Sequence, residues 1–93
     1  INQEEVQGKK TAFLRIHNVM LEVYESEETA EKTGSIDHLS LSVETVDRLY
    51  QEMLPEYKVL SSEVEQLPYW KNGIRFFKVE GPNKEVIEFC EIL

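Results

Sequence analysis

Two short segments that resemble each other constrain the fold of this chain more than any other feature. Residues 20–25 read Met-Leu-Glu-Val-Tyr-Glu, and residues 86–91 read Val-Ile-Glu-Phe-Cys-Glu. Their glutamates, Glu22 and Glu88, are separated by 88 − 22 = 66 positions. The segments before them, 11–16 and 74–79, match at a similar offset. An internal match of this kind predicts two copies of a hairpin that ends a structural module.

Residues 86–93 fit either a strand or one stripe of a helix. Three features favour the strand: the run is short, it is rich in β-branched and aromatic residues, and a Gly-Pro-Asn turn precedes it. Alternate side chains of a strand point to opposite faces. Glu88 is therefore expected to share a face with Cys90, and Glu22 to share a face with Tyr24.

The remaining pattern predicts an α+β fold. A stripe of apolar residues indicates a helix over residues 44–54, formed by Val46, Leu49, Tyr50 and Met53. Residues 1–10 are expected to be a loop or a weak strand end, and residues 26–34 a charged linker. Strands are predicted at residues 11–16, 19–25, 36–43, 57–64, 74–80 and 85–92.

These elements predict one domain built from two unequal parts. Residues 1–33 are interpreted as the C-terminal hairpin of an incomplete first module plus a linker. Residues 34–93 are interpreted as a complete second module of strand, helix and three strands. The first module lacks its opening strand and helix. Either the natural chain extends about 35 residues upstream, the length of that pair in residues 35–64, or another chain completes the fold.

Charge and cysteine content exclude several classes of partner. The net charge of −8 argues against binding to nucleic-acid phosphates and to anionic membrane surfaces. A single cysteine cannot form an internal disulfide, which favours an intracellular, cytoplasmic protein. The sequence contains neither a signal peptide nor an apolar run near 18 residues.

Three side chains form a candidate metal site. His38, Glu22 and Glu88 are expected on strand faces that point away from the helix, so they would line one cup if the two modules pack side by side. One imidazole and two carboxylates suit a divalent metal such as zinc, nickel, iron, cobalt or manganese. The alternative is that both glutamates lie in water and that His38 is only a hydrogen-bonded residue of the cup.

The strand around Ile36-Asp37-His38 and the later run from Gly81-Pro82-Asn83 to Ile87-Glu88-Phe89 resemble the vicinal oxygen chelate superfamily. This group includes glyoxalases, bleomycin-resistance proteins and extradiol dioxygenases, and the closest resemblance is to bacterial glyoxalase I-like proteins (lactoylglutathione lyases). The resemblance implies βαβββ modules that form a cupped mixed sheet around a metal, with helices on the outer face.

The resemblance also implies a chemistry. Glu22, His38 and Glu88 match metal ligands of the family, with nickel or zinc as the expected metal, and Glu88 or Glu22 matches the base that moves a proton beside a carbonyl. The implied substrate is a small hemithioacetal-type molecule, and the implied assembly is a homodimer. Substrate contacts are expected from Tyr24, Trp70 and Arg75.

Two other functions remain open from the sequence. A binding protein of the same fold would sequester a small molecule without catalysis, in a cup lined by aromatic residues such as Tyr24, Tyr69 and Trp70. An assembly unit without a site of its own would pair its exposed sheet edges with another chain.

Overall fold

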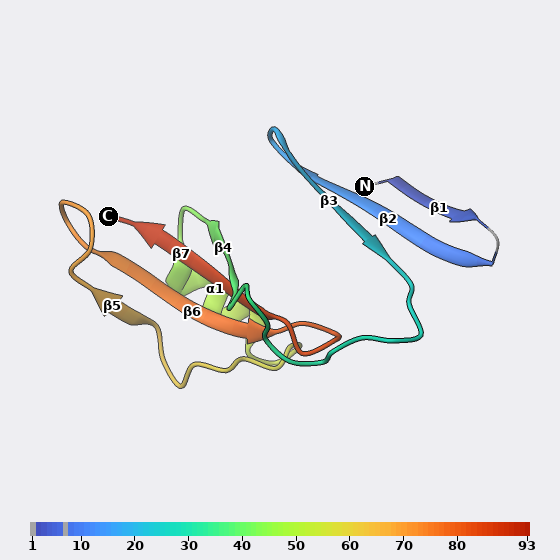
Figure 1. The fold of residues 1–93 in the computed structure, drawn as a ribbon. Coiled ribbons are helices and arrows are strands. Elements are labelled where there is room, and N and C mark those ends of the chain that lie inside the picture. Colours follow the sequence, from blue (N-terminus) through green and yellow to red (C-terminus); the bar gives the residue numbers. More distant parts are fainter. Residues whose placement is uncertain (1, 7) are drawn as a thin grey trace.

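The computed structural model describes the backbone of residues 2–6 and 8–93, and the side chains from residue 8 onward, as an α+β arrangement of two sheets and one helix (Figure 1). The first sheet contains β1 (Asn2–Val6), β2 (Lys9–Ile16) and β3 (Val19–Tyr24) in that order. The second sheet has the order β4-β7-β6-β5 and is accompanied by helix α1. Its elements are β4 (Leu39–Ser42), α1 (Val46–Met53), β5 (Glu65–Leu67), β6 (Ile74–Glu80) and β7 (Val86–Ile92).

Strand β7 lies at the centre of the second sheet. It pairs in parallel with β4 and antiparallel with β6, so the sheet is mixed. Glu88 of β7 is level with Ser40 of β4 on one side and with Lys78 of β6 on the other. The predicted strands at residues 74–80 and 85–92 are confirmed, with the second beginning at Val86.

Helix α1 covers one face of the second sheet and forms the core with it. Val46 and Phe77 are fully buried, and Tyr50 and Val79 are nearly so. The ring of Tyr50 meets the ring of Phe77 edge-on, with 5.2 Å between the centroids, a geometry that aromatic pairs favour. The predicted apolar stripe is confirmed, because Leu49 and Met53 also pack against this core.

A strand side chain caps the first turn of α1. The N-cap residue Thr45 makes no side-chain capping hydrogen bond. Instead the backbone N–H of Val46 donates to Oε1 of Glu91, 3.0 Å away on β7. A carboxylate at this end satisfies a free N–H group and interacts favourably with the helix dipole. The helix is thereby fixed to the strand that it covers.

Two predictions for the second half are corrected. The strand expected at residues 36–43 is limited to Leu39–Ser42. The strand expected at residues 57–64 reduces to a single bridge between Val59 and Val79, and the regular strand β5 follows it. The ladder breaks at Ser61, because its Oγ accepts the hydrogen bond from the backbone N–H of Lys78.

The first sheet is larger than the sequence predicted. The sequence predicts a loop or a weak strand end for residues 1–10, and the structure has a five-residue strand at residues 2–6 that pairs antiparallel with β2. The polar sequence of residues 2–6 shows no alternation of apolar residues that would predict a strand. These residues form a strand because they pair with the backbone of β2. The β1-β2-β3 meander therefore has the same order as β5-β6-β7, so the repeat covers three strands in each half.

The pairing registers also correct the repeat offset within the hairpins. Leu14 pairs with Leu21, and Val79 pairs with Ile87. Ile87 and Leu21 are equivalent residues, 87 − 21 = 66 positions apart. Their pairing partners, Val79 and Leu14, are therefore equivalent too and lie 79 − 14 = 65 positions apart. Comparison of the sequences alone gives an offset of 63 for the same segments. The difference of two residues leaves every side chain on its predicted face.

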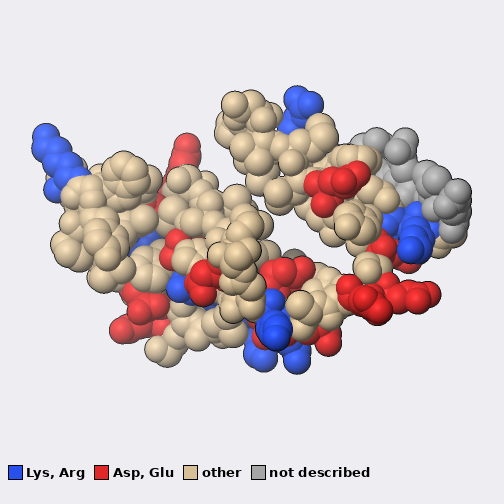
Figure 2. All heavy atoms as spheres, in the orientation of Figure 1, with Lys and Arg blue, Asp and Glu red and all other residues tan. Residues whose placement is uncertain are grey.

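The two sheets do not form one cup. Among residues 2–6 and 8–93, no strand of the first sheet contacts an element of the second sheet. Figure 2 shows open space between the part of the molecule that contains the first sheet and the part that contains the second sheet. The radius of gyration is 15.2 Å, above the value of about 12 Å for a compact domain of this length. The expectation that the two parts line a shared cavity is therefore not met within this chain.

In the part of the chain that the structure describes, no helix has the length and apolar character needed to cross a bilayer.

We expect Phe77→Ala to lower the free energy of unfolding by about 3–5 kcal/mol, because it removes a fully buried ring beneath α1. Val19→Ala is the control, since Val19 is 57% exposed and its loss should change stability by less than about 0.5 kcal/mol. Urea unfolding followed by circular dichroism measures both. Equal destabilisation by the two changes would contradict this placement of the core.

Candidate functional site

The face of the second sheet opposite α1 brings two of the predicted ligands together. His38 lies directly before β4, and Glu88 lies on the neighbouring strand β7. Nε2 of His38 is 3.6 Å from Oε2 of Glu88. The side chain of Glu88 is 13% exposed and that of His38 is 29% exposed, so the pair is partly shielded but open to small molecules.

Ser40 holds the carboxylate of Glu88. Its Oγ donates a hydrogen bond of 2.6 Å to Oε2 of Glu88 and lies 3.3 Å from Sγ of the buried Cys90. A hydroxyl has one proton, and the carboxylate is the stronger acceptor. The Ser40 proton is therefore committed to Glu88, and Sγ of Cys90 is the weaker acceptor beside the same hydroxyl.

Asp37 orients the ring of His38. Oδ2 of Asp37 is 2.8 Å from Nδ1 of His38. The hydrogen bond from His38 lowers the pKa of the Asp37 carboxyl below its ordinary value. An ionised Asp37 accepts the Nδ1 proton, and this hydrogen bond orients the ring so that its other nitrogen, Nε2, faces Glu88.

The His38–Glu88 separation fits two ligands of one cation. Zinc lies about 2.1 Å from histidine nitrogen and from carboxylate oxygen. At those lengths the observed 3.6 Å between Nε2 and Oε2 corresponds to an angle of about 118° at the metal, close to tetrahedral. The residues described here contain no group of three His, Cys, Asp or Glu side chains able to hold a metal. Within the described residues, His38 and Glu88 therefore bring together two side chains of metal-binding type, not three.

The structure does not bring Glu22 to this pair. Glu22 lies on β3 in the first sheet, where it is exposed and level with Phe13 of β2. Tyr24 lies two residues further along the same strand and is 65% exposed. Glu22 and Tyr24 lie on the same face of β3, as predicted. Within the described residues, however, the first sheet does not contact the second sheet.

Arg75 and Trp70 also lie apart from the His38–Glu88 pair. Arg75 points to the helix side of β6, where its guanidinium binds the carboxylate of Asp47 on α1 and Oε1 of Gln66. The hydrogen bond to Asp47 raises the pKa of Arg75. Trp70 lies in the turn between β5 and β6 with a φ of 63° and is 67% exposed.

Sequence reasoning missed Asp37 and Ser40 as parts of the site. Both contact a predicted ligand directly, at 2.8 Å and 2.6 Å. The signal for Ser40 was present in the sequence, because a strand next to apolar segments carries His38, Ser40 and Ser42 on one face. Asp37 has no periodic signal, since it reaches His38 through an irregular backbone before β4.

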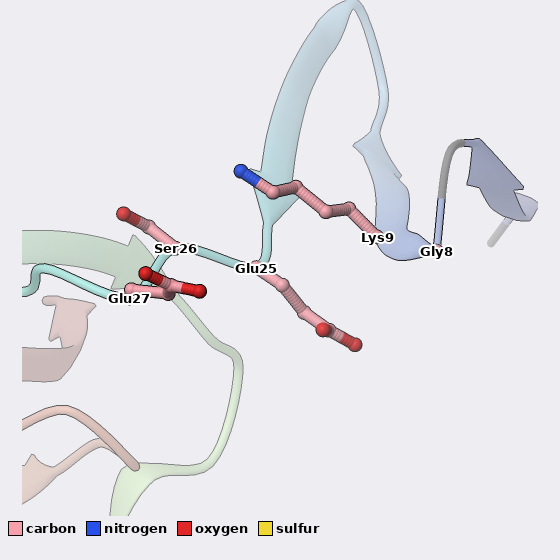
Figure 3. A pocket seen from close by; sticks show the side chains of 5 residues that line it. All are labelled: Gly8, Lys9, Glu25, Ser26 and Glu27. Atoms are coloured by element: carbon pink, nitrogen blue, oxygen red, sulfur yellow. The ribbon is translucent and has the colours of Figure 1, made fainter.

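An open hollow of about 340 Å³ lies at one end of the first sheet (Figure 3). Gly8 and Lys9 line it from β2 and the turn before it, and Glu25, Ser26 and Glu27 line it from the linker after β3. All five residues are exposed. None of the predicted site residues borders this hollow.

Comparisons of the chain with protein-family models, with curated proteins and with solved structures find no match.

We expect carboxyl-detected NMR titration to give Asp37 a pKa below its ordinary value, and His38→Ala to return it to that value. Because the folded-state pKa is lowered, the contribution of this contact to stability is present above the unfolded pKa. It is lost as the pH falls through the folded pKa. Glu65→Gln, which changes an exposed carboxylate on β5, is the control variant that should leave the Asp37 titration unchanged. An unaltered Asp37 titration in His38→Ala would contradict the contact.

Proposed function

We propose that this chain supplies half of a metal-dependent lyase or isomerase site of the glyoxalase type, with His38 and Glu88 as metal ligands. The observation that carries the proposal is the pairing of Nε2 of His38 with Oε2 of Glu88 at 3.6 Å. The order strand, helix and three strands over residues 39–92 also agrees with the βαβββ module that the sequence resemblance implies.

The electrostatics of the pair favour a bound cation. Asp37 accepts the Nδ1 proton of His38, so the ring nitrogen that faces the Glu88 carboxylate is Nε2. A carboxylate oxygen beside this nitrogen attracts a cation placed between the two atoms. A second residue that orients the ligand through its other ring nitrogen is a common feature of histidine metal sites.

Glu88 has the position required of the base. Ser40 and His38 both contact Oε2 of Glu88, which leaves Oε1 to take a proton from the carbon beside a substrate carbonyl. The same carboxyl then returns this proton to the neighbouring carbon, while the hydroxyl proton passes from one substrate oxygen to the other, so the isomerisation is balanced. The bound metal would stabilise the negative charge that develops on the substrate oxygens.

The proposed third ligand, Glu22, would come from the first sheet of a completed cup. Glu22 occupies the position in β3 that Glu88 occupies in β7, on the face opposite Leu21. Packing of this face against the His38–Glu88 face, within one chain or between the two chains of a homodimer, would complete a three-ligand site with an open position.

Calorimetric titration with zinc and nickel tests the proposal. We expect stoichiometric binding that weakens at least about tenfold in His38→Ala and in Glu88→Gln, because each removes one of the donors. The controls are His17→Ala, which removes the other histidine in a surface turn, and Glu65→Gln on β5. Full metal occupancy in both ligand variants would exclude this site.

A metal-free binding protein of the same fold is the second candidate. It is favoured by one observation, that the described residues contain two and not three converging donors. Such a protein would keep its affinity for a small ligand in the Glu22→Gln, Glu88→Gln double variant. Turnover of a hemithioacetal that this double variant abolishes would favour the enzyme instead.

A further inference from the structure

The turn between β5 and β6 contains an asparagine followed by a glycine, Asn72 and Gly73. Asn72 is exposed, and Gly73 directly precedes β6 with a φ of 98°, a conformation that favours glycine. A Cβ at residue 73 would also lie 3.2 Å from the backbone oxygen of Leu67, which is tighter than an ordinary contact. The fold therefore requires a residue without a side chain directly after Asn72.

The backbone nitrogen of Gly73 can react with the side chain of Asn72. Among the residues that the structure describes, the N–H of Gly73 donates no hydrogen bond, so no hydrogen bond has to break first. A bond from this nitrogen to Cγ of Asn72 closes a five-membered ring. Because both groups belong to adjacent residues, the reaction is intramolecular and needs no other positioned group. Gly73 also has no side chain to hinder the approach.

Two other turn asparagines lack these conditions. Asn83 is followed by Lys84, which carries a side chain and whose N–H donates a hydrogen bond of 3.1 Å to the backbone oxygen of Gly81. Asn18 is followed by Val19, a β-branched residue that pairs with the preceding strand at the start of β3. The conditions for attack on an asparagine side chain therefore favour Asn72 over these two.

We propose that Asn72 is a site of spontaneous deamidation. The deprotonated amide nitrogen of Gly73 attacks Cγ of Asn72, the bond from Cγ to the side-chain nitrogen breaks, and that nitrogen takes up protons and leaves as ammonia. Water then opens the cyclic imide at one of its two carbonyls. Opening at one carbonyl gives aspartate, and opening at the other gives isoaspartate, whose main chain runs through Cβ and Cγ. The reaction consumes one water, releases one ammonia and adds one negative charge.

The isoaspartyl product changes the end of the second sheet, where the β5–β6 turn lies beside the last residue of β7 (Figure 1). The backbone oxygen of Gly73 accepts a hydrogen bond of 3.0 Å from the N–H of Leu93. Isoaspartate inserts one main-chain carbon directly before Gly73, which displaces this oxygen and breaks the bond. Aspartate leaves the main chain as it was. The isoaspartyl form therefore frees the end of β7, and the aspartyl form does not.

This change is separate from the candidate metal site. Glu88 lies five residues before Leu93 along β7, which is about 17 Å for an extended strand. Deamidation at Asn72 and metal binding at His38 and Glu88 can therefore be measured independently in the same chain.

Peptide mapping of the aged chain by mass spectrometry tests the proposal. The folded chain is incubated at mildly alkaline pH, where the amide nitrogen loses its proton more readily, and is then cut after glutamates. Fragments 66–80 and 81–85 each contain one asparagine, Asn72 and Asn83. We expect the deamidated fraction at Asn72 to exceed that at Asn83 at least about tenfold, with both aspartate and isoaspartate formed.

The matched control is Asn72→Gln, whose longer side chain would have to close a six-membered ring and should give no deamidation at this position. Incubation of the unmodified chain in urea shows what the unfolded sequence does. The proposal is overturned if Asn72 and Asn83 deamidate equally in the folded chain. It is also overturned if Asn72 deamidates in urea but stays intact when the chain is folded.

Hydrogen exchange at the amide of Leu93, followed by NMR, tests the structural consequence. We expect faster exchange in the separated isoaspartyl form than in the unmodified chain. The Asn72→Asp variant carries the same added charge on an ordinary main chain and should keep the exchange rate of the unmodified chain. Equal rates in all three forms would show that the extra main-chain carbon does not free the end of β7.

Discussion

The alternation of side chains along β7 is the constraint on which the second half of the structure depends. Ile87, Phe89 and Glu91 point toward α1, where two of them pack in the core and the third caps the helix. Glu88 and Cys90 point to the other face, where Ser40 meets both. A shift of one residue in the pairing would exchange the two sets, so the same register fixes the core and the candidate site together.

The faces of the strands could be predicted from the sequence, because period-two alternation depends only on the local pattern. For this reason the approach of His38 to Glu88 and the helix-covered core agree with expectation. The sequence leaves residues 2–6 open between a loop and a weak strand end, since these mostly polar residues carry no apolar signal and are held by pairing with the backbone of β2. The separation of the two sheets, which keeps Glu22 away from His38, depends on distant packing that no local pattern encodes.

The two halves of the chain differ in whether a helix covers the sheet, and this difference decides how well the apolar side chains are buried. In the second sheet a helix of eight residues is enough to bury Phe77 and Val79. The first sheet has three strands in the same meander order, but among the described residues no helix contacts it, and Ile16, Val19 and Val23 remain about half exposed. A small sheet needs a covering layer to bury apolar area, and within the part of the chain that the structure describes only the second sheet has one.

The segment between β3 and β4 determines how the two sheets can meet. It contains 39 − 24 − 1 = 14 residues without helix or strand, and a flexible chain of that length has a root-mean-square end-to-end distance of about 20 Å. A tether this short holds the first sheet at a local concentration in the millimolar range around the second. If the two sheets pack against each other, this tether would favour packing within one molecule at micromolar protein, and packing between molecules would dominate only at comparable, millimolar concentrations.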